Sequence, residues 1–177
     1  MTKALQISDI QNLQTYKNQI LKNLHKTTIS MVELLKKEDT LTIFEMLKFN
    51  KIATEPLSGE PENIIEVINQ SHTYLVSIMA VEYLLKTHPS KTFIINWGNL
   101  PGYDIESTDG EIIAECFAAT SYKSNGKLTT DLKRLNANTS AVCKYEFFYD
   151  REFTDNHKTY YKDKYPEIEI VKFKNIH

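Results

Sequence analysis

The sequence predicts a mixed α/β fold, in which a helical lobe precedes strands and helices arranged around a mixed sheet. Residues 7–49 contain no glycine or proline and repeat apolar residues at helical intervals. Short β-rich runs follow residue 90, and one segment between them, residues 127–135, returns to helical spacing. A helix between two strands implies a parallel crossover, whereas a tight turn implies antiparallel pairing, so the sheet should contain both kinds of pair.

The first domain is the helical lobe, which we assign to residues 1–55. Its apolar periodicity predicts two or three helices. We expect a break at residues 27–30 (TTIS), because Ser30 stands three residues before Glu33, as in a capping box. This lobe is a candidate dimerisation element or, alternatively, part of a DNA clamp.

The second domain spans residues 56–177 and begins with a connector that contains Pro56 and Gly59. Its first helix should end before Pro89, because a residue that precedes proline is disfavoured in the helical region. Gly110 favours a hairpin turn, since glycine adopts positive φ at little cost. We expect a helix at 62–87, strands at 92–97, 103–107 and 111–118, a helix at 127–135, a strand at 141–149, an irregular segment, and a strand at 167–173.

Composition limits the classes of function. The chain has 177 residues with 21 basic and 23 acidic side chains, so bulk charge does not hold it to nucleic acid and a polyanion must be met locally. It has 2 cysteines and no charged start followed by an apolar segment and cleavage site, which argues against a disulfide-stapled secreted domain. Apolar runs fall short of the ~20 residues that span a bilayer. We therefore expect a cytoplasmic protein without a membrane span.

Charge reverses sharply along the second domain. Residues 61–118 hold eight acids and two bases, whereas residues 119–136 hold four bases and one acid. Acids on a strand hairpin followed by bases on a loop and helix suit a site that binds a divalent cation beside a phosphate. The alternative is a solvated hairpin next to a solvated helix. Residues 147–165 interleave aromatic with basic residues, a pattern that suits contact with nucleic acid, but bases and acids balance over residues 144–177, so we expect half of the segment to be core and ordinary surface.

Two carboxylates of the predicted hairpin stand in apolar surroundings. Glu115 lies within the run Ile112–Phe117 (IIAECF), and Asp104 lies between Tyr103 and Ile105. A carboxylate there is costly unless it is paired, protonated or bound to a metal. Pairing about the turn brings the two acids within one position of each other, and converging carboxylates raise a pKa or recruit a hard cation such as Mg²⁺. The alternative is a structural ion pair of Glu115 with Arg134 or a lysine.

These residues carry a resemblance. The run Pro101–Asp104 (PGYD), followed by the IIAECF run within an αβββαβ order, resembles the core of the PD-(D/E)XK nuclease superfamily, the fold of type II restriction endonucleases. The resemblance covers about residues 61–150. It implies that Asp104, Glu115 and the backbone carbonyl of Cys116 bind Mg²⁺, for which Mn²⁺ should substitute.

The chain departs from the family at Phe117, which stands where the motif has a lysine. Some members of the superfamily carry that lysine on the following helix. Lys127 opens the corresponding helix and is our candidate for the group that positions the attacking water, with Lys123 as second choice. Phe117 alternatively marks a site that has lost its chemistry. The residues that we expect to contact phosphates are Lys123, Lys133 and Arg134.

The resemblance implies a Mg²⁺-dependent endonuclease of restriction type that hydrolyses phosphodiester bonds in double-stranded DNA. A homodimer is expected, because two identical sites most simply cut both strands of a two-fold target. The alternative is a catalytically inactive protein of the same fold that acts as a binding or regulatory module. The choice between DNA and RNA, and the sequence recognised, stay open.

Overall fold

The computed structural model describes residues 3–98 and 101–176 and confirms the predicted mixed α/β fold. The chain divides into two compact units. The sheet unit comprises Met1–Leu13 and Thr73–His177, and the helical unit comprises Gln14–His72. This division differs from the predicted 1–55 and 56–177, because the N-terminal residues belong with the sheet and the first turns of the helix after the connector belong with the helical unit.

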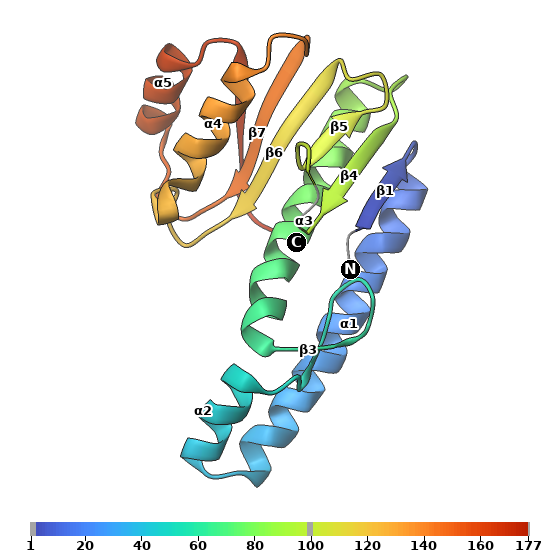
Figure 1. Cartoon of the computed structure of the whole chain (residues 1–177), viewed down its shortest axis with the longest axis vertical. Coiled ribbons are helices and arrows are strands. Elements are labelled where there is room, and N and C mark those ends of the chain that lie inside the picture. The colour runs from blue at the N-terminus through green and yellow to red at the C-terminus, as the bar shows by residue number, and fades with distance from the viewer. Residues whose placement is uncertain (1–2, 99–100, 177) are drawn as a thin grey trace. The chain divides into compact units, whose positions relative to one another are not determined.

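The sheet unit is built on a six-stranded mixed sheet with the strand order β1-β4-β5-β6-β7-β8 (Figure 1). Strands β1 to β6 pair antiparallel along this order, and β6, β7 and β8 pair parallel. Helices α4 and α5 make the two crossovers between the parallel strands. The bounds are β1 Lys3–Ile7, β4 Phe93–Trp97, β5 Ile105–Ser107, β6 Ile112–Ala118, α4 Lys127–Ala137, β7 Cys143–Tyr149, α5 Asp155–Lys164 and β8 Ile168–Phe173, with a short 3-10 turn at Ser124–Gly126.

Helices cover both faces of this sheet. On the face that carries α4 and α5, leucines of α4 pack against Ile113, Phe117 and Phe148 (Figure 1). The rings of Phe117 and Phe148 stack with centroids 5.1 Å apart. On the opposite face, the part of α3 (Ile64–Thr87) that belongs to the sheet unit places Tyr83 against Tyr145 and Phe147. Side chains of β6 and β7 therefore alternate between two apolar layers, and a polar group in either strand is buried whichever way it faces.

The hairpin that carries the two acids forms as predicted. Gly110 closes the turn at a φ of 74°, and its amide donates to the Ser107 carbonyl at 2.8 Å. Ile105 then pairs with Ala114 across β5 and β6. Glycine is favoured at this position because the positive φ carries no Cβ penalty.

The helical unit consists of most of α1 (Ile10–Lys37), α2 (Thr40–Phe49), the short strands β2 (Ala53–Thr54) and β3 (Pro61–Glu62), and the start of α3. Asp39 caps α2 by accepting hydrogen bonds from the Leu41 and Thr42 amides. A small core of Ala53, Ile64 and Val67 packs against α1 and α2 residues. None of the described helices is long and apolar enough to cross a membrane.

Three expectations about secondary structure are wrong. Helix α1 runs through residues 27–30 without the predicted break, because the Thr27 hydroxyl bonds to Thr54 and the Thr28 hydroxyl bonds back to the Leu24 carbonyl. Ser30 is thus no cap. Residues 155–164 form α5 instead of an irregular segment, and residues 3–7 form an edge strand that was not predicted. In both cases the segment gains its structure by packing against or pairing with the sheet.

We predict that Leu132→Ala, which empties a fully buried position between α4 and the sheet, lowers the free energy of unfolding by about 2–5 kcal/mol. Chemical denaturation followed by circular dichroism measures this. Val142→Ala is the control, because Val142 is exposed and the truncation leaves no cavity. Equal stabilities for the two variants would contradict the packing of α4 described above.

Candidate active site

Two carboxylates meet on the α4 face of the sheet. Asp104 immediately precedes β5, and extending the pairing of Ile105 with Ala114 by one residue places Asp104 directly opposite Glu115. An Asp104 carboxylate oxygen also accepts a hydrogen bond from the Cys116 amide at 2.8 Å. The predicted convergence of Asp104 and Glu115 within one position is therefore confirmed, since it follows from the hairpin register.

Glu115 is fully buried, with a side chain 0% exposed. One of its carboxylate oxygens lies 2.8 Å from a guanidinium nitrogen of Arg134, but neither oxygen accepts an aligned hydrogen bond from the residues that the structure describes. Burial and the negative charge of Asp104 raise the pKa of Glu115, the positive charge of Arg134 lowers it, and the resulting pKa is about 8. Glu115 is thus a buried acid with one positively charged neighbour and unsatisfied hydrogen-bonding capacity.

Arg134 is bound to the site from the exposed edge of α4. Its guanidinium donates to the Gly102 carbonyl and lies 4.8 Å from the ring centroid of Tyr103, in addition to the contact with Glu115. The structure places Arg134 in the ion pair with Glu115 that was the alternative interpretation, and its contact with phosphates stays a prediction.

Lys127 also faces these acids. Its ammonium lies 2.8 Å from a carboxylate oxygen of Asp131, one helical turn later. Burial lowers the pKa of Lys127, but the hydrogen bond to Asp131 and the charges of Asp104 and Glu115 outweigh burial and raise it overall. The ammonium is therefore held charged within the field of the two hairpin carboxylates.

Two further acids belong to the same group and were not predicted as site residues. Asp131 has a side chain that is 3% exposed, and burial raises its pKa to about 6. Glu146 is 0% exposed, and burial, with Asp131 and Glu115 adding, raises its pKa well above its ordinary value. We call Asp104, Glu115, Asp131 and Glu146 the acid cluster.

Sequence patterns could have found Glu146 but not Asp131. Glu146 stands in the apolar run Tyr145–Phe148, which is the same signal that identified Glu115, and it is the register partner of Glu115 across β6 and β7. Asp131 carries no such signal, because an acid four residues after a lysine in a helix is a common surface pair. Its burial follows from the docking of α4 on the sheet.

The remaining predicted residues lie outside the acid cluster. Phe117 is buried in the core between α4 and the sheet. It is one of several residues that line the space next to Lys127. Lys123 is exposed and its ammonium lies 5.5 Å from the ring centroid of Tyr122, and Lys133 is exposed on α4. Cys116 contributes its amide to Asp104, while burial raises the pKa of its thiol.

An open cavity of about 360 Å³ adjoins Lys127 at the end of β6 and the start of α4. The loop that closes it places Asn125 and Gly126 at φ values of 53° and 64°. Asparagine and glycine tolerate the left-handed region better than other residues, so Asn125 and Gly126 suit the turn that presents Lys127. The lining residues are Thr73, Phe117, Ala118, Ala119, Ser124, Asn125, Lys127 and Thr130.

The donor chemistry of the cluster suits a hard divalent cation. Asp104 and Glu115 present carboxylates from facing strands, and the buried Glu115 oxygens lack aligned donors. Within the described residues, no group of three or more histidine, cysteine, aspartate or glutamate side chains gathers with the spacing of a metal site. A cation in this site would have two carboxylate ligands, Asp104 and Glu115, and the Cys116 carbonyl as the third predicted ligand.

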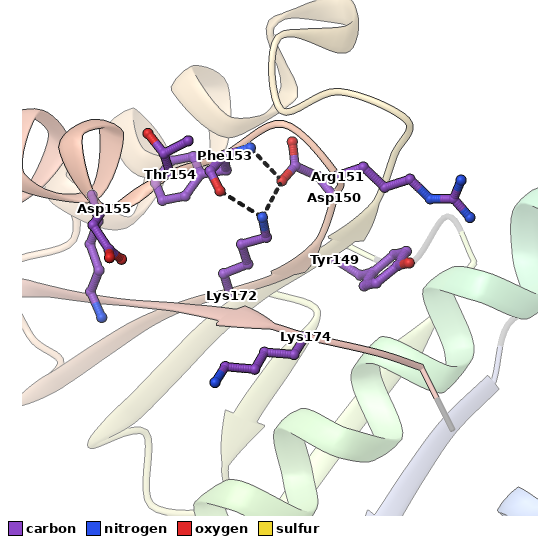
Figure 2. A pocket seen from close by; sticks show the side chains of 9 residues that line it. Tyr149, Asp150, Arg151, Phe153, Thr154, Asp155, Lys172 and Lys174 are labelled. Atoms are coloured by element: carbon purple, nitrogen blue, oxygen red, sulfur yellow. Dashed lines mark hydrogen bonds and ion pairs between the residues drawn. The ribbon is translucent and has the colours of Figure 1, made fainter.

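Figure 2 shows a second cavity of the sheet unit, of about 570 Å³, where β7 ends and α5 begins. The buried Asp150 holds Lys172 at 3.3 Å, and the Lys172 ammonium also donates to the Phe153 carbonyl at 2.6 Å. Lys172 is thus structural. The three exposed bases that line the cavity are Arg151, Lys158 and Lys174.

Comparison with known proteins gives no relative for this chain: no protein-family model matches it, and searches of curated proteins and of solved structures find no match.

We predict that Glu115 makes stability depend on pH between pH 6 and 8. The folded chain keeps the Glu115 proton up to about pH 8, whereas the unfolded chain releases it near the ordinary glutamate pKa of 4.5, so the free energy of unfolding falls as pH rises through this window. The expected slope from this group is about 1 kcal/mol per pH unit. Glu115→Gln should remove that part of the slope.

Urea denaturation at pH 6, 7 and 8 measures the effect. Glu66→Gln is the matched control, because Glu66 is exposed, and it should keep the wild-type slope. Identical slopes for wild type and Glu115→Gln would contradict the raised pKa.

Proposed function

We propose that this chain is a Mg²⁺-dependent nuclease that hydrolyses phosphodiester bonds in double-stranded DNA. The observation that carries the proposal is the convergence of Asp104 and Glu115 from facing strands, with the Lys127 ammonium held in the field of both. Carboxylates paired with an amine suit phosphoryl hydrolysis, since they hold a cation and position the attacking water.

The residues would divide the work as follows. Asp104, Glu115 and the Cys116 carbonyl would hold Mg²⁺ or Mn²⁺, which would polarise the scissile phosphate and acidify an attacking water. Lys127 would orient that water from the side of the open cavity and stabilise the negative charge that develops on the phosphate oxygens. Asp131, 2.8 Å from Lys127, would keep the ammonium charged and fixed in direction.

Exposed bases give the proposal a route to the DNA backbone. Lys123 and Lys133 lie in the loop before α4 and on α4 itself, on the same side of the sheet as the acid cluster. The basic cavity in Figure 2 adds three exposed cations in the same unit. Backbone phosphates are the natural ligands of such groups.

The proposal extends to assembly and compartment. A homodimer would bring two identical sites to the two strands of a symmetric target. We place the protein in the cytoplasm, where Cys116 and Cys143 would stay as the free thiols that the structure describes.

A second candidate function is a catalytically inactive binding or regulatory module. Phe117 favours it, because the position of the motif lysine is occupied by a core side chain. The contact of Arg134 with Glu115 also favours it, because a guanidinium lies where a cation would bind. Activity of defined variants separates the two functions.

We predict that the protein nicks supercoiled plasmid in the presence of Mg²⁺ or Mn²⁺, and that Glu115→Ala lowers the rate at least about 100-fold through loss of a cation ligand. Chelation of the metal should stop nicking as completely. Glu111→Ala is the matched control, since Glu111 is an exposed acid of the same hairpin that pairs with Lys91. Nicking that persists in Glu115→Ala would refute the assignment, and inactivity of the wild type would favour the binding module.

We predict that Lys127→Met lowers kcat by about 10²- to 10⁴-fold without weakening Mn²⁺ binding, because it removes the group that orients the water but no cation ligand. Single-turnover cleavage and Mn²⁺ titration measure the two quantities. Lys123→Met tests the second-choice lysine and should weaken DNA binding with little effect on kcat. The reverse pattern would assign the catalytic amine to Lys123.

A further inference from the structure

Arg134 contacts the carboxylate of Glu115, which would bind a divalent cation in the proposed function. Its guanidinium nitrogen lies 2.8 Å from the Glu115 oxygen, and this ion pair is formed with a side chain from which solvent is excluded. A buried carboxylate without a positive partner is strongly disfavoured, so this contact stabilises the acid cluster in the absence of any metal. Lys127 does not serve Glu115 in this way, since its ammonium lies on Asp131.

The same guanidinium ties the strand that carries Asp104 to α4. It donates to the Gly102 carbonyl and stacks over the Tyr103 ring at 4.8 Å, and these two residues lead directly into Asp104. Arg134 thereby holds both halves of the carboxylate pair in place while Asp104 and Glu115 repel each other.

Arg134 reaches these groups from the solvent side of α4. Its side chain is 44% exposed, so the guanidinium has access to water. Its remaining partners are the carbonyl of the exposed Gly102 and the half-buried Tyr103 ring. A guanidinium and a divalent cation on the same carboxylate repel each other strongly away from bulk water, so the two cannot share Glu115.

We propose that Arg134 is the exchangeable counter-ion of this site: it pairs with Glu115 when no divalent cation is bound, it leaves when one binds, and it thereby sets the cation affinity of the site. This inference rests on the proposed function, because it takes Asp104 and Glu115 as the cation ligands. It adds that metal binding is a competition between Mg²⁺ and a side chain of the protein itself.

The test is Mn²⁺ binding without DNA, measured on the full chain by the electron paramagnetic resonance signal of free Mn²⁺. Arg134→Gln should bind Mn²⁺ at least about tenfold more tightly than wild type, since the competing charge is gone. Lys164→Gln is the matched control, because it removes one exposed positive charge of the same unit from α5, outside the acid cluster. Its Mn²⁺ affinity should equal that of wild type. Adding Glu115→Gln to either chain should abolish binding and so locate the ion.

Each outcome decides the proposal. Tighter binding by Arg134→Gln alone supports it, including the case in which wild type shows no measurable binding. Equal or weaker binding by folded Arg134→Gln, where wild type binds through Glu115, overturns the counter-ion role and leaves the proposed function standing. Absence of binding in every variant overturns both.

Loss of the ion pair could also prevent folding, which a melting curve by circular dichroism detects. Arg134→Lys then decides, because a lysine keeps the charge but cannot reach Glu115, Gly102 and Tyr103 together with one ammonium group. Tighter Mn²⁺ binding than wild type by Arg134→Lys supports the proposal, and equal or weaker binding overturns it.

Discussion

The cost of burying Glu115 governs the arrangement of the site. A fully buried carboxylate in an apolar strand must be protonated, paired or bound to a cation, and this chain surrounds it with groups that serve each of these ends. Burial and Asp104 favour the proton, and Arg134 supplies a positive charge. Asp131 on α4 and Glu146 on β7 are two further buried acids that need compensation. Lys127 is the second positively charged side chain near them. The acid cluster is thus a region where folding leaves polar groups incompletely satisfied, which is typical of a functional site.

The topology explains why these groups meet. An antiparallel hairpin sets Asp104 opposite Glu115, and the parallel crossover sets Glu146 beside Glu115. Helix α4 then contributes Lys127, Asp131 and Arg134, which stand at i, i+4 and i+7 and therefore form one stripe along the helix. The neighbouring stripe of Leu128, Leu132 and Leu135 anchors α4 on the sheet. One docking event therefore positions the cations and buries an acid, and the stability of the α4 interface and the electrostatics of the site are linked.

Phe117 occupies a core position on the strand that also carries Glu115. It shares a face of β6 with Glu115, but its ring stacks on Phe148 within the core. A lysine there would bury a charge in the tightest part of that core. The first position of α4 offers an ammonium partial access to water while still facing the acids, and Lys127 takes that position with a side chain 43% exposed. The two proposed functions differ in whether the Lys127 amine suffices for chemistry and in whether a cation replaces Arg134 on Glu115.

The sequence by itself determined the αβββαβ order, the hairpin and the opposition of Asp104 and Glu115, because alternation, turn residues and strand register are local properties of the chain. It also contained the signal for Glu146, which stands in an apolar strand as Glu115 does. Only the tertiary structure decided that α1 is unbroken, that residues 3–7 join the sheet, that Asp131 is buried and that Arg134 lies on Glu115. Those outcomes depend on contacts between segments far apart in the chain, whose free energies exceed the local preferences that a sequence pattern records.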